Sequence, residues 1–453
     1  MNYSQAIARL NSFIDFERLP EPRFSTTPED IDRFRALLEE LGAPHRRYSV
    51  IHIVGTKGKG STAAMLTAVL RAAGYRVGLY TSPHLISVRE RIRLNGRMVS
   101  KVDFAKLISR TLATADSRPD SGQLAFRTVF EHLTAVALLY YARQRADIVV
   151  VEAGLGAKLD ATIVLDPALS IITPIGLDHT LVLGDTISKI AADKSHAIKP
   201  GVAAVTAPQT PEAMRELTGR AKGVGSHLVT APGRDEFEVK ELSLHGTRCR
   251  APLRNWIKSD LQMRLPGRFQ LDNASVVLSA LELLRDRGWR IPSNAVGEGL
   301  RSVLWFGRLQ YLSGKSGVVL DGSHNALSMR AVHDALAELA PDTRWQVVFS
   351  ALMSKPVQEM MAILGPLSAG FHLAPIRFPK AAPVEQLVAA VENVNVPFCV
   401  YRSVPKAYEG ALNRCRIGQR VLVTGSFYLV GEVMRHRRGL KPPPVGGKID
   451  ADI

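Results

Sequence analysis

The chain alternates short runs of β-branched and aliphatic residues with longer stretches in which apolar residues recur at helical spacing. Most of these apolar runs are followed by Gly, Pro or Asp, as strands are when they meet a loop. The runs predicted to form strands are residues 48–54, 75–80, 147–152, 169–173, 202–206, 317–321, 345–350 and 420–424. Strands that alternate with helices in this way predict an α/β fold, in which a parallel sheet is covered by helices.

This alternation is interrupted once, which predicts two domains. Residues 226–265 have the pattern of meandering strands and loops, and the alternation resumes after Gly307. A single hydrophobic core rarely serves more than about 250 to 300 residues. We therefore expect domains at residues 1–302 and 303–434, with the linker near 300–306. The last segment, 435–453, carries clustered bases and three consecutive prolines, which predicts a flexible tail.

Composition narrows the class of protein. The chain is 46% hydrophobic and 22% charged, as folded proteins are. Its net charge of +16 suits a nucleic acid, a membrane surface or an anionic small molecule. Three cysteines without CxxC spacing indicate neither a disulfide framework nor a zinc site and favour a reducing compartment. No apolar run reaches about 18 residues, so we expect a cytoplasmic protein with no membrane partner.

The strongest chemical signal is a glycine-rich loop, GTKGKGST, between the first predicted strand and a helical stretch. Backbone N–H groups and a helix N-terminus cradle phosphates in such loops, Lys59 is placed to neutralise a terminal phosphate, and a hydroxyl from Ser61 or Thr62 to approach Mg²⁺. The alternative is a tight turn with a surface lysine. The candidate nucleotide-binding residues here are Gly55, Thr56, Gly58, Lys59, Gly60, Ser61 and Thr62.

Polar side chains also follow the next predicted strands. Ser82 lies in TSPHL after the second strand, Glu152 ends the third directly before AGLG, and the pair Asp178 and His179 follows the fourth. Ligands gather at this edge of open α/β sheets. Each residue also has a structural interpretation: Ser82 as a turn residue, Glu152 as the partner of a lysine, and His179 as a structural histidine.

Together these motifs resemble folylpolyglutamate synthase and bifunctional dihydrofolate synthase, a branch of the Mur ligase superfamily. The segments that carry the resemblance are 55–62, 80–85 with 89–92, 152–162, 176–179, 193–199 and 321–325. They occur in the order of the family and extend the resemblance from about residue 30 to residue 431. The resemblance implies a larger N-terminal ATPase domain of the P-loop type, a smaller Rossmann-like C-terminal domain, and ATP held between them.

The resemblance also implies a metal centre. Ser82 and Glu152 would hold one Mg²⁺, and Glu152, His179 and a carbamylated Lys194 would hold a second; a bound K⁺ is compatible with the family as well. An ammonium has no lone pair for a metal, whereas the CO₂ adduct of a lysine offers oxygen ligands. An unmodified Lys194 paired with a phosphate is the alternative.

Asn273 resembles the family's adenine-contacting asparagine. In the second domain, Arg308 resembles the family's phosphate arginine and Asp321 its nucleotide-binding aspartate, with His324 and Lys355 as weaker candidates. The reaction implied joins L-glutamate to dihydropteroate or a reduced folate through an acyl phosphate, without a protein nucleophile. Either His324 or a phosphate oxygen takes the proton of the incoming amine. The catalytic candidates are Lys59, Lys194, His179, Arg308 and His324.

Two segments resemble the lining of the family's pterin pocket. They are Thr128, Val129, Phe130 and Glu131, and Leu159, Asp160 and Ala161. An aromatic ring stacks on a pterin and an acid accepts from its amino groups, although a place in a helical core would also explain Phe130.

Five positions depart from the family pattern, namely Lys57, Ile163, His196, Phe306 and Ala326. They leave open whether the acceptor is dihydropteroate, a folate or both, and they keep a specialised paralogue with another carboxylate substrate as the alternative. Another amide ligase of the superfamily would lack the TSPHL and LDAT combination, and a nucleic-acid motor would need basic patches interleaved with aromatic residues. A binding module without activity would not retain every nucleotide and metal residue. We expect a monomer that binds small polyanions, which also accounts for the basic charge.

Overall fold

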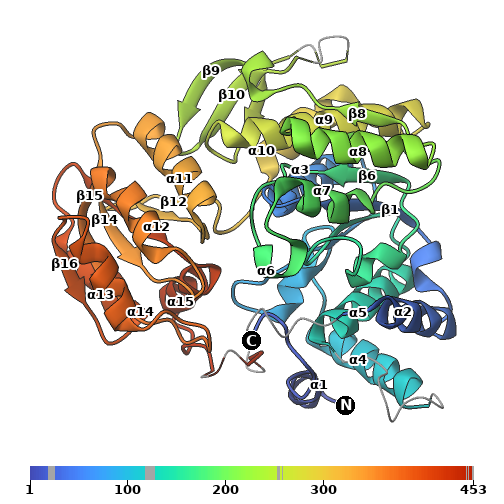
Figure 1. Cartoon of the computed structure of the whole chain (residues 1–453), viewed down its shortest axis with the longest axis horizontal. Helices are drawn as coiled ribbons and strands as arrows, with labels where there is room; N and C mark the ends of the chain where they lie inside the picture. The colour runs from blue at the N-terminus through green and yellow to red at the C-terminus, as the bar shows by residue number, and fades with distance from the viewer. Residues whose placement is uncertain are drawn as a thin grey trace.

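The computed structural model describes residues 1–18, 26–117, 128–252, 256–257, 259–444, 446 and 448–450. Two bodies lie side by side, one built from the N-terminal two thirds of the chain and one from the C-terminal third (Figure 1). All eight strands predicted from the sequence are present, each with ends within two residues of those expected. The predicted α/β class is therefore confirmed.

The N-terminal body is built on an eight-stranded sheet with the order β4-β3-β2-β5-β1-β6-β7-β8. All neighbouring strands are parallel except at the edge, where β3 runs antiparallel to β2 and to β4. The strands are β1 Ser49–Val54, β2 Val77–Tyr80, β3 Ile92–Leu94, β4 Arg97–Met98, β5 Ile148–Glu152, β6 Leu169–Ile172, β7 Ala204–Thr206 and β8 Leu228–Thr230. Because β1 lies between β5 and β6, the loop that follows β1 opens at the centre of the sheet edge.

Helices cover both faces of this sheet (Figure 1). Alternate residues of β5 enter opposite cores: Val149 and Val151 pack with α4 and α5, and Ile148 and Val150 pack with α3, α9 and α10. The helices are α1 Tyr3–Leu10, α2 Pro28–Glu40, α3 Lys59–Ala72, α4 Lys101–Asp116, α5 Val129–Arg143, α6 Thr180–Leu183, α7 Ile187–Ser195, α8 Pro211–Gly223, α9 Phe269–Asp286 and α10 Ser293–Ser302. The meandering segment forms an antiparallel sheet of β9 Glu238–Ser243, β10 Gly246–Arg250 and β11 Leu261–Met263.

The C-terminal body has a six-stranded sheet with the order β12-β13-β17-β14-β15-β16, parallel except for β12. Its strands are β12 Gln310–Leu312, β13 Val318–Leu320, β14 Arg344–Phe349, β15 Ser368–Leu373, β16 Phe398–Val400 and β17 Gln419–Thr424. Its helices are α11 Ala326–Leu339, α12 Val357–Leu364, α13 Val384–Glu392, α14 Val404–Arg414 and α15 Phe427–Arg437. Helices α11 to α13 pack on one face, and α14 and α15 on the other. In the part of the chain that is described, no helix is long and apolar enough to span a membrane.

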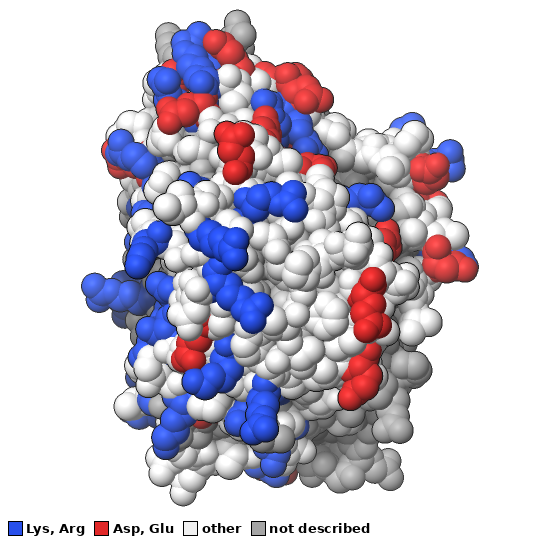
Figure 2. Space-filling view, turned by 90° about the vertical axis from the view of Figure 1, so that its left-hand side faces the viewer, with Lys and Arg blue, Asp and Glu red and all other residues white. Residues whose placement is uncertain are grey.

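Part of the positive charge lies far from the sheet edges that form the site. Figure 2 shows the face of the C-terminal body that is turned away from the N-terminal body, and Lys and Arg side chains gather along one side of this face. The net charge of +16 is therefore distributed over the surface as well as around the loops between the two bodies.

The described part of the tail packs against the folded chain, where composition predicted a flexible segment. Arg435 lies within α15, is 3% exposed, donates to Lys441 O at 2.9 Å and pairs with Asp450. Ile449 is buried in the core of the N-terminal body, and its backbone N–H donates to Asn11 Oδ1 at 2.9 Å. The described part of the tail thus contacts the N-terminal body through Ile449 and pairs with α15 through Asp450. Composition alone does not identify such individual contacts.

A buried acid on α15 makes stability depend on pH. Glu432 is buried and accepts from the backbone N–H of Arg377 at 2.6 Å. Burial raises the pKa of Glu432 to about 7. Because this pKa is higher in the folded chain than in the unfolded one, the stabilisation from the protonated form is complete below pH ~4.5 and is lost as the pH rises to about 7.

We expect Glu432→Gln, which keeps the acceptor for Arg377, to raise the free energy of unfolding relative to wild type by about 2 kcal/mol more at pH 8 than at pH 4.5. Denaturant unfolding at both pH values measures this difference. The matched control is Glu392→Gln at an exposed position on α13. A Glu432→Gln effect of the same size at both pH values would contradict the expectation.

Candidate active site

The glycine-rich loop joins the central strand β1 to α3, and hydrogen bonds and close packing fix its backbone conformation. The backbone N–H groups of Thr56 and Lys57 donate to Pro174 O at 3.0 and 3.2 Å. Gly58 has φ of 84°, and a Cβ there would lie 2.1 Å from Asn273 Oδ1, so only glycine fits. No described side chain caps α3, which leaves N–H groups of its first turn available to an anion. The Lys59 ammonium lies over the loop, 3.2 Å from Gly55 O.

The ends of β2 and β5 bring Ser82 and Glu152 together beside this loop. The Ser82 N–H donates to Glu152 Oε2 at 3.3 Å. Burial raises the pKa of Glu152, and the Lys59 ammonium opposes this rise. Both residues line a hollow between the two bodies together with Gly60 of the loop and Arg308 of the C-terminal body. Four residues predicted separately from sequence therefore surround one small space.

Lys194 on α7 is buried near the same loop. Burial, and then the neighbouring Lys59 ammonium, lower the pKa of Lys194 to about 7. A neutral amine is the form that adds CO₂, so this environment suits carbamate formation. Within the described residues, no three His, Cys, Asp or Glu side chains group as a metal site. The donors present fit Mg²⁺ only as a set that includes the Ser82 hydroxyl or the oxygens of a Lys194 carbamate. His179 precedes α6 and has φ of 50°.

The C-terminal body contributes Arg308, Asp321 and His324. The Arg308 guanidinium lies 4.1 Å from the centre of the Phe427 ring. Burial lowers the pKa of Arg308, opposed by Asp321 and Glu152. The carboxylate of Asp321 is occupied by two backbone N–H groups, those of Leu309 and Ser323, each at 2.8 Å. Asp321 thus shapes the turn that presents Arg308.

His324 is poorly suited to accept a proton. Its Nδ1 lies 3.0 Å from Gly322 O. Burial, and then the charges of Lys57 and Lys355, lower the pKa of His324 to about 3. The imidazole therefore stays neutral near pH 7 and gains a proton only with difficulty.

Asp178 connects the two bodies. Its Oδ2 accepts from Lys57 Nζ at 2.8 Å and from Asn325 Nδ2 at 3.0 Å, and its Oδ1 lies 3.5 Å from Lys355 Nζ. Burial alone would raise the pKa of Asp178, but the charges of Lys57, His179 and Lys355 hold this pKa well below its usual range. The GLDH motif marked Asp178, but nothing in the sequence indicated which cations it pairs with.

Asn273 on α9 packs directly against the loop. Its Nδ2 donates to Gln270 Oε1 at 2.9 Å, and its Oδ1 faces Gly58. The structure thus places the asparagine that resembles the adenine contact beside the glycine-rich loop. Ser61 and Thr62 lie in the first turn of α3 and are buried.

The two segments predicted to line a pterin pocket meet at one point. The Phe130 ring packs against Gly154, where a Cβ would lie 2.8 Å from Phe130 Cζ and 3.1 Å from Asp160 Oδ2. Asp160 accepts from the N–H groups of Gly154 and Leu155 at 2.9 and 3.0 Å. Phe130 also lies 5.9 Å from the Tyr80 ring. Aromatic rings and a carboxylate therefore converge beside the loop that follows β5.

The other residues of these segments have structural roles. Thr128 and Glu131 form the capping box of α5, with the Thr128 N–H donating to Glu131 Oε2 at 3.0 Å. Val129 and Ala161 are buried in the hydrophobic core, and Leu159 packs against that core. Asp160 also accepts from the Thr162 N–H at 2.9 Å and caps the short helix Ala161–Val164. Of the predicted pterin residues, the partly exposed Phe130 is thus the one whose position best suits a ligand.

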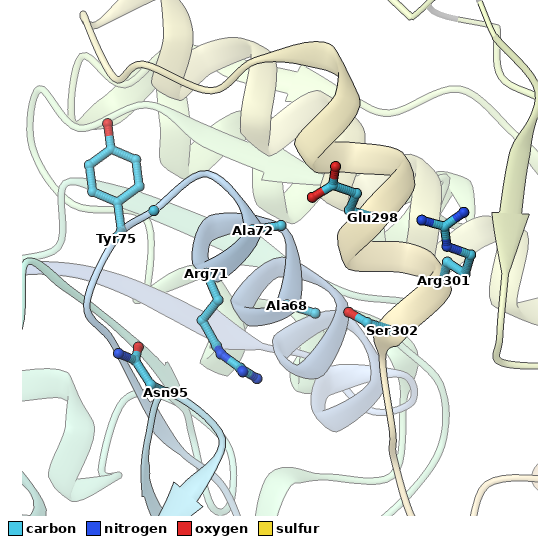
Figure 3. Close-up of a pocket in the computed structure, with 9 residues that line it drawn as sticks. Ala68, Arg71, Ala72, Tyr75, Asn95, Glu298, Arg301 and Ser302 are labelled. Atoms are coloured by element: carbon cyan, nitrogen blue, oxygen red, sulfur yellow. The ribbon is translucent and has the colours of Figure 1, made fainter.

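Figure 3 shows a second, larger hollow of about 690 Å³, at the C-terminal end of α3. Its lining includes Arg71, Glu298 and Arg301. Because α3 has 14 residues, about 20 Å of helix separates this hollow from the glycine-rich loop. None of the predicted site residues lines it, so size alone does not mark the active site.

Both bodies match known protein domains. Residues 53–281 match the Mur ligase middle domain, and residues 307–427 match the Mur ligase glutamate ligase domain. The dihydrofolate synthase/folylpolyglutamate synthase of Bacillus subtilis is 32% identical over 416 residues, which cover 91% of this chain and 96% of that protein.

Two solved structures have the same fold. Escherichia coli FolC in complex with DHPP and ADP has a TM-score of 0.82 and 25% identity, covering 97% of this chain and 98% of that one. The bifunctional enzyme of Yersinia pestis, complexed with AMPPNP and Mn ion, has a TM-score of 0.79 and 26% identity, covering 97% and 98%. The expected ligase class is confirmed, and the alternative of a ligase outside this family is not supported. The chain belongs to the family of ATP-dependent ligases that comprises dihydrofolate synthase and folylpolyglutamate synthase.

Proposed function

We propose that this ligase adds L-glutamate to dihydropteroate, to reduced folates or to both, at the junction of its two bodies. The observation that carries the proposal is the meeting of Ser82, Glu152 and Arg308 around Gly60 of the glycine-rich loop. A hollow that combines a phosphate loop, an acidic strand end and an arginine from the facing body suits phosphoryl transfer. The DHPP bound by the Escherichia coli relative supports a pterin-containing acceptor.

In the first step, an oxygen of the acceptor carboxylate bonds to the γ-phosphorus of ATP, and the bond to the ADP oxygen breaks. Lys59 and Arg308 neutralise the charge that develops on the phosphate oxygens. Two Mg²⁺ ions, when bound, would supply further neutralisation; Ser82 and Glu152 would hold one, and Glu152, His179 and the Lys194 carbamate the other. The Yersinia relative's Mn ion supports a divalent cation.

In the second step, the amine nitrogen of L-glutamate bonds to the acyl carbon and phosphate leaves, forming an amide. The amine must lose a proton. A pKa of about 3 makes His324 a weak base, which favours a phosphate oxygen as the acceptor of that proton. His324 then serves to shape the turn from Asp321 to Asn325. Phe130 would bind the pterin by stacking. Asp160, whose two oxygens accept from backbone N–H groups of the chain, would hold the loop beside it.

We further propose that the protein acts as a monomer in the cytoplasm, on small anions and not on nucleic acid. All three cysteines, Cys249, Cys399 and Cys415, are free thiols, which suits a reducing compartment.

The test is mass-spectrometric detection of glutamate addition, with dihydropteroate and tetrahydrofolate supplied in parallel. We expect phosphate release only when ATP, Mg²⁺, L-glutamate and one of these acceptors are all present. Product from one acceptor alone, or from both, identifies the activity. Equal ATP turnover without any pterin compound would refute the assignment of a pterin-containing acceptor.

A further inference from the structure

A single buried carboxylate joins the phosphate loop to the C-terminal body. Asp178 binds Lys57 of the loop at 2.8 Å, Asn325 at the start of α11 at 3.0 Å, and Lys355 before α12 at 3.5 Å. The side chains of Asp178 and Lys355 are only 10% and 11% exposed, and that of Lys57 is 24% exposed. These contacts are shielded from solvent, so they are stronger than surface ion pairs.

Lys57 is the member of this cluster that departs from the family pattern. An added cation in a phosphate loop suggests a direct role in binding phosphate. The structure instead pairs Lys57 with Asp178, while Lys59 lies over the loop near Gly55. The charge of Lys57 is thus compensated by a carboxylate, and Lys59 remains the loop's phosphate-directed cation.

The cluster of Asp178 with Lys57, Asn325 and Lys355 lies at the junction of the two bodies. Arg308 reaches the hollow beside Gly60 and Glu152 only because the C-terminal body lies against the N-terminal body. Asn325 and Lys355 belong to that same C-terminal body. The groups that face Asp178 are Lys57 and His179 from the N-terminal body, and Asn325, Lys355 and His324 from the C-terminal one. The same carboxylate therefore contacts both the phosphate loop and the body that carries Arg308.

We propose that Lys57 is a positioning residue of the ligase reaction: it holds the Asp178 carboxylate in the orientation that binds Asn325 and Lys355, and so couples the phosphate loop to closure of the C-terminal body. This inference rests on the proposed function, because closure is read out through ligation. Lys57 acts through Asp178 and does not touch the reacting atoms.

The experiment compares Lys57→Asn, Asp178→Asn, the double variant and the conservative Lys57→Arg. We expect Lys57→Asn to lower kcat about tenfold, as loss of an energetic coupling of this kind does, while the dissociation constant for ADP, measured by calorimetry, changes less than about threefold. Lys57→Arg keeps a cation opposite Asp178 and is expected to recover most of kcat. The control is Lys406→Asn, which removes an exposed lysine paired with Glu409 and is expected to leave kcat unchanged.

The double variant tests whether Lys57 works through Asp178. We expect it to be no slower than the slower single variant, because the two residues form one unit. Additive losses, or a tenfold weaker ADP affinity with unchanged kcat, would overturn the proposal. Circular dichroism shows whether each variant is folded. If Asp178→Asn does not fold, the comparison of Lys57→Asn with Lys57→Arg remains as the test. Wild-type protein inactive with both acceptors would refute the proposed function, whereas active wild type matched by Lys57→Asn would refute only this inference.

Discussion

Lys194→Ala is expected to reduce ligation by about 10²–10³-fold, the loss typical of removing one electrostatic contact to a transition state. The reason lies in the surroundings of the lysine. Burial and the Lys59 ammonium lower the pKa of Lys194 to about 7, so the neutral amine that reacts with CO₂ is well populated at neutral pH. Without a carbamate at Lys194, no group of three His, Cys, Asp or Glu side chains among the described residues is placed to hold a metal ion. Glutamate addition followed by mass spectrometry measures the loss.

The same helix offers a matched control. Lys189 on α7 is exposed and pairs with Asp185 at 2.9 Å, so Lys189→Ala is expected to retain the wild-type rate. A carbamate predicts in addition that ¹³C-labelled bicarbonate gives a carbonyl resonance in wild type that is missing from Lys194→Ala. Full activity of Lys194→Ala would show that no carbamate takes part in the reaction.

Sequence predicted the central strands because parallel strands that are buried on both faces are nearly continuous apolar runs. Strands β5 and β17 are of this kind. The strands without a prediction of their own lie in the meandering segment or mostly at sheet edges, as β4, β12 and β16 do. Edge strands are short and partly exposed, so their composition differs little from that of loops. Composition gave no sign of the contacts of the tail for a related reason, because Ile449 is buried beside Asn11, 438 residues away in the chain.

Prediction of the candidate site was limited in the same way, by contacts between residues that lie far apart in the chain. The glycine-rich loop, Ser82 and Glu152 were predictable because each follows a strand, and strand ends of a parallel sheet meet at one edge. The Asp178 cluster was not, because its partners lie 121 and 147 residues away in the chain. Thr128 and Glu131 of the pterin segments match the family motif, and they also match a capping box, which they form in the structure.

Arg308→Ala is expected to lower kcat by about 10²–10³-fold and to raise the KM for ATP to a smaller extent. Arg308 is the cation that the C-terminal body contributes to the hollow around Gly60 and Glu152. Its guanidinium stacks 4.1 Å from the centre of the Phe427 ring. Burial lowers the pKa of Arg308, but a guanidinium remains charged at neutral pH even so. The positive charge is therefore held in place before substrates bind.

The lysine substitution separates charge from shape. Arg308→Lys keeps one positive charge but loses the planar fork and the stacking on Phe427, so we expect it to recover less than about a tenth of wild-type kcat, because the two cations are not interchangeable at a stacked site. Arg330→Ala is the control in the same body, since Arg330 is exposed and pairs with Glu359 at 3.1 Å. Steady-state kinetics with ATP varied at saturating acceptor and L-glutamate give kcat and KM for each variant. If Arg308→Ala raised only the KM for ATP, Arg308 would bind the nucleotide equally in the ground and transition states. Its position beside Glu152 would then serve affinity alone, and charge stabilisation during phosphoryl transfer would rest on Lys59 and the bound cations.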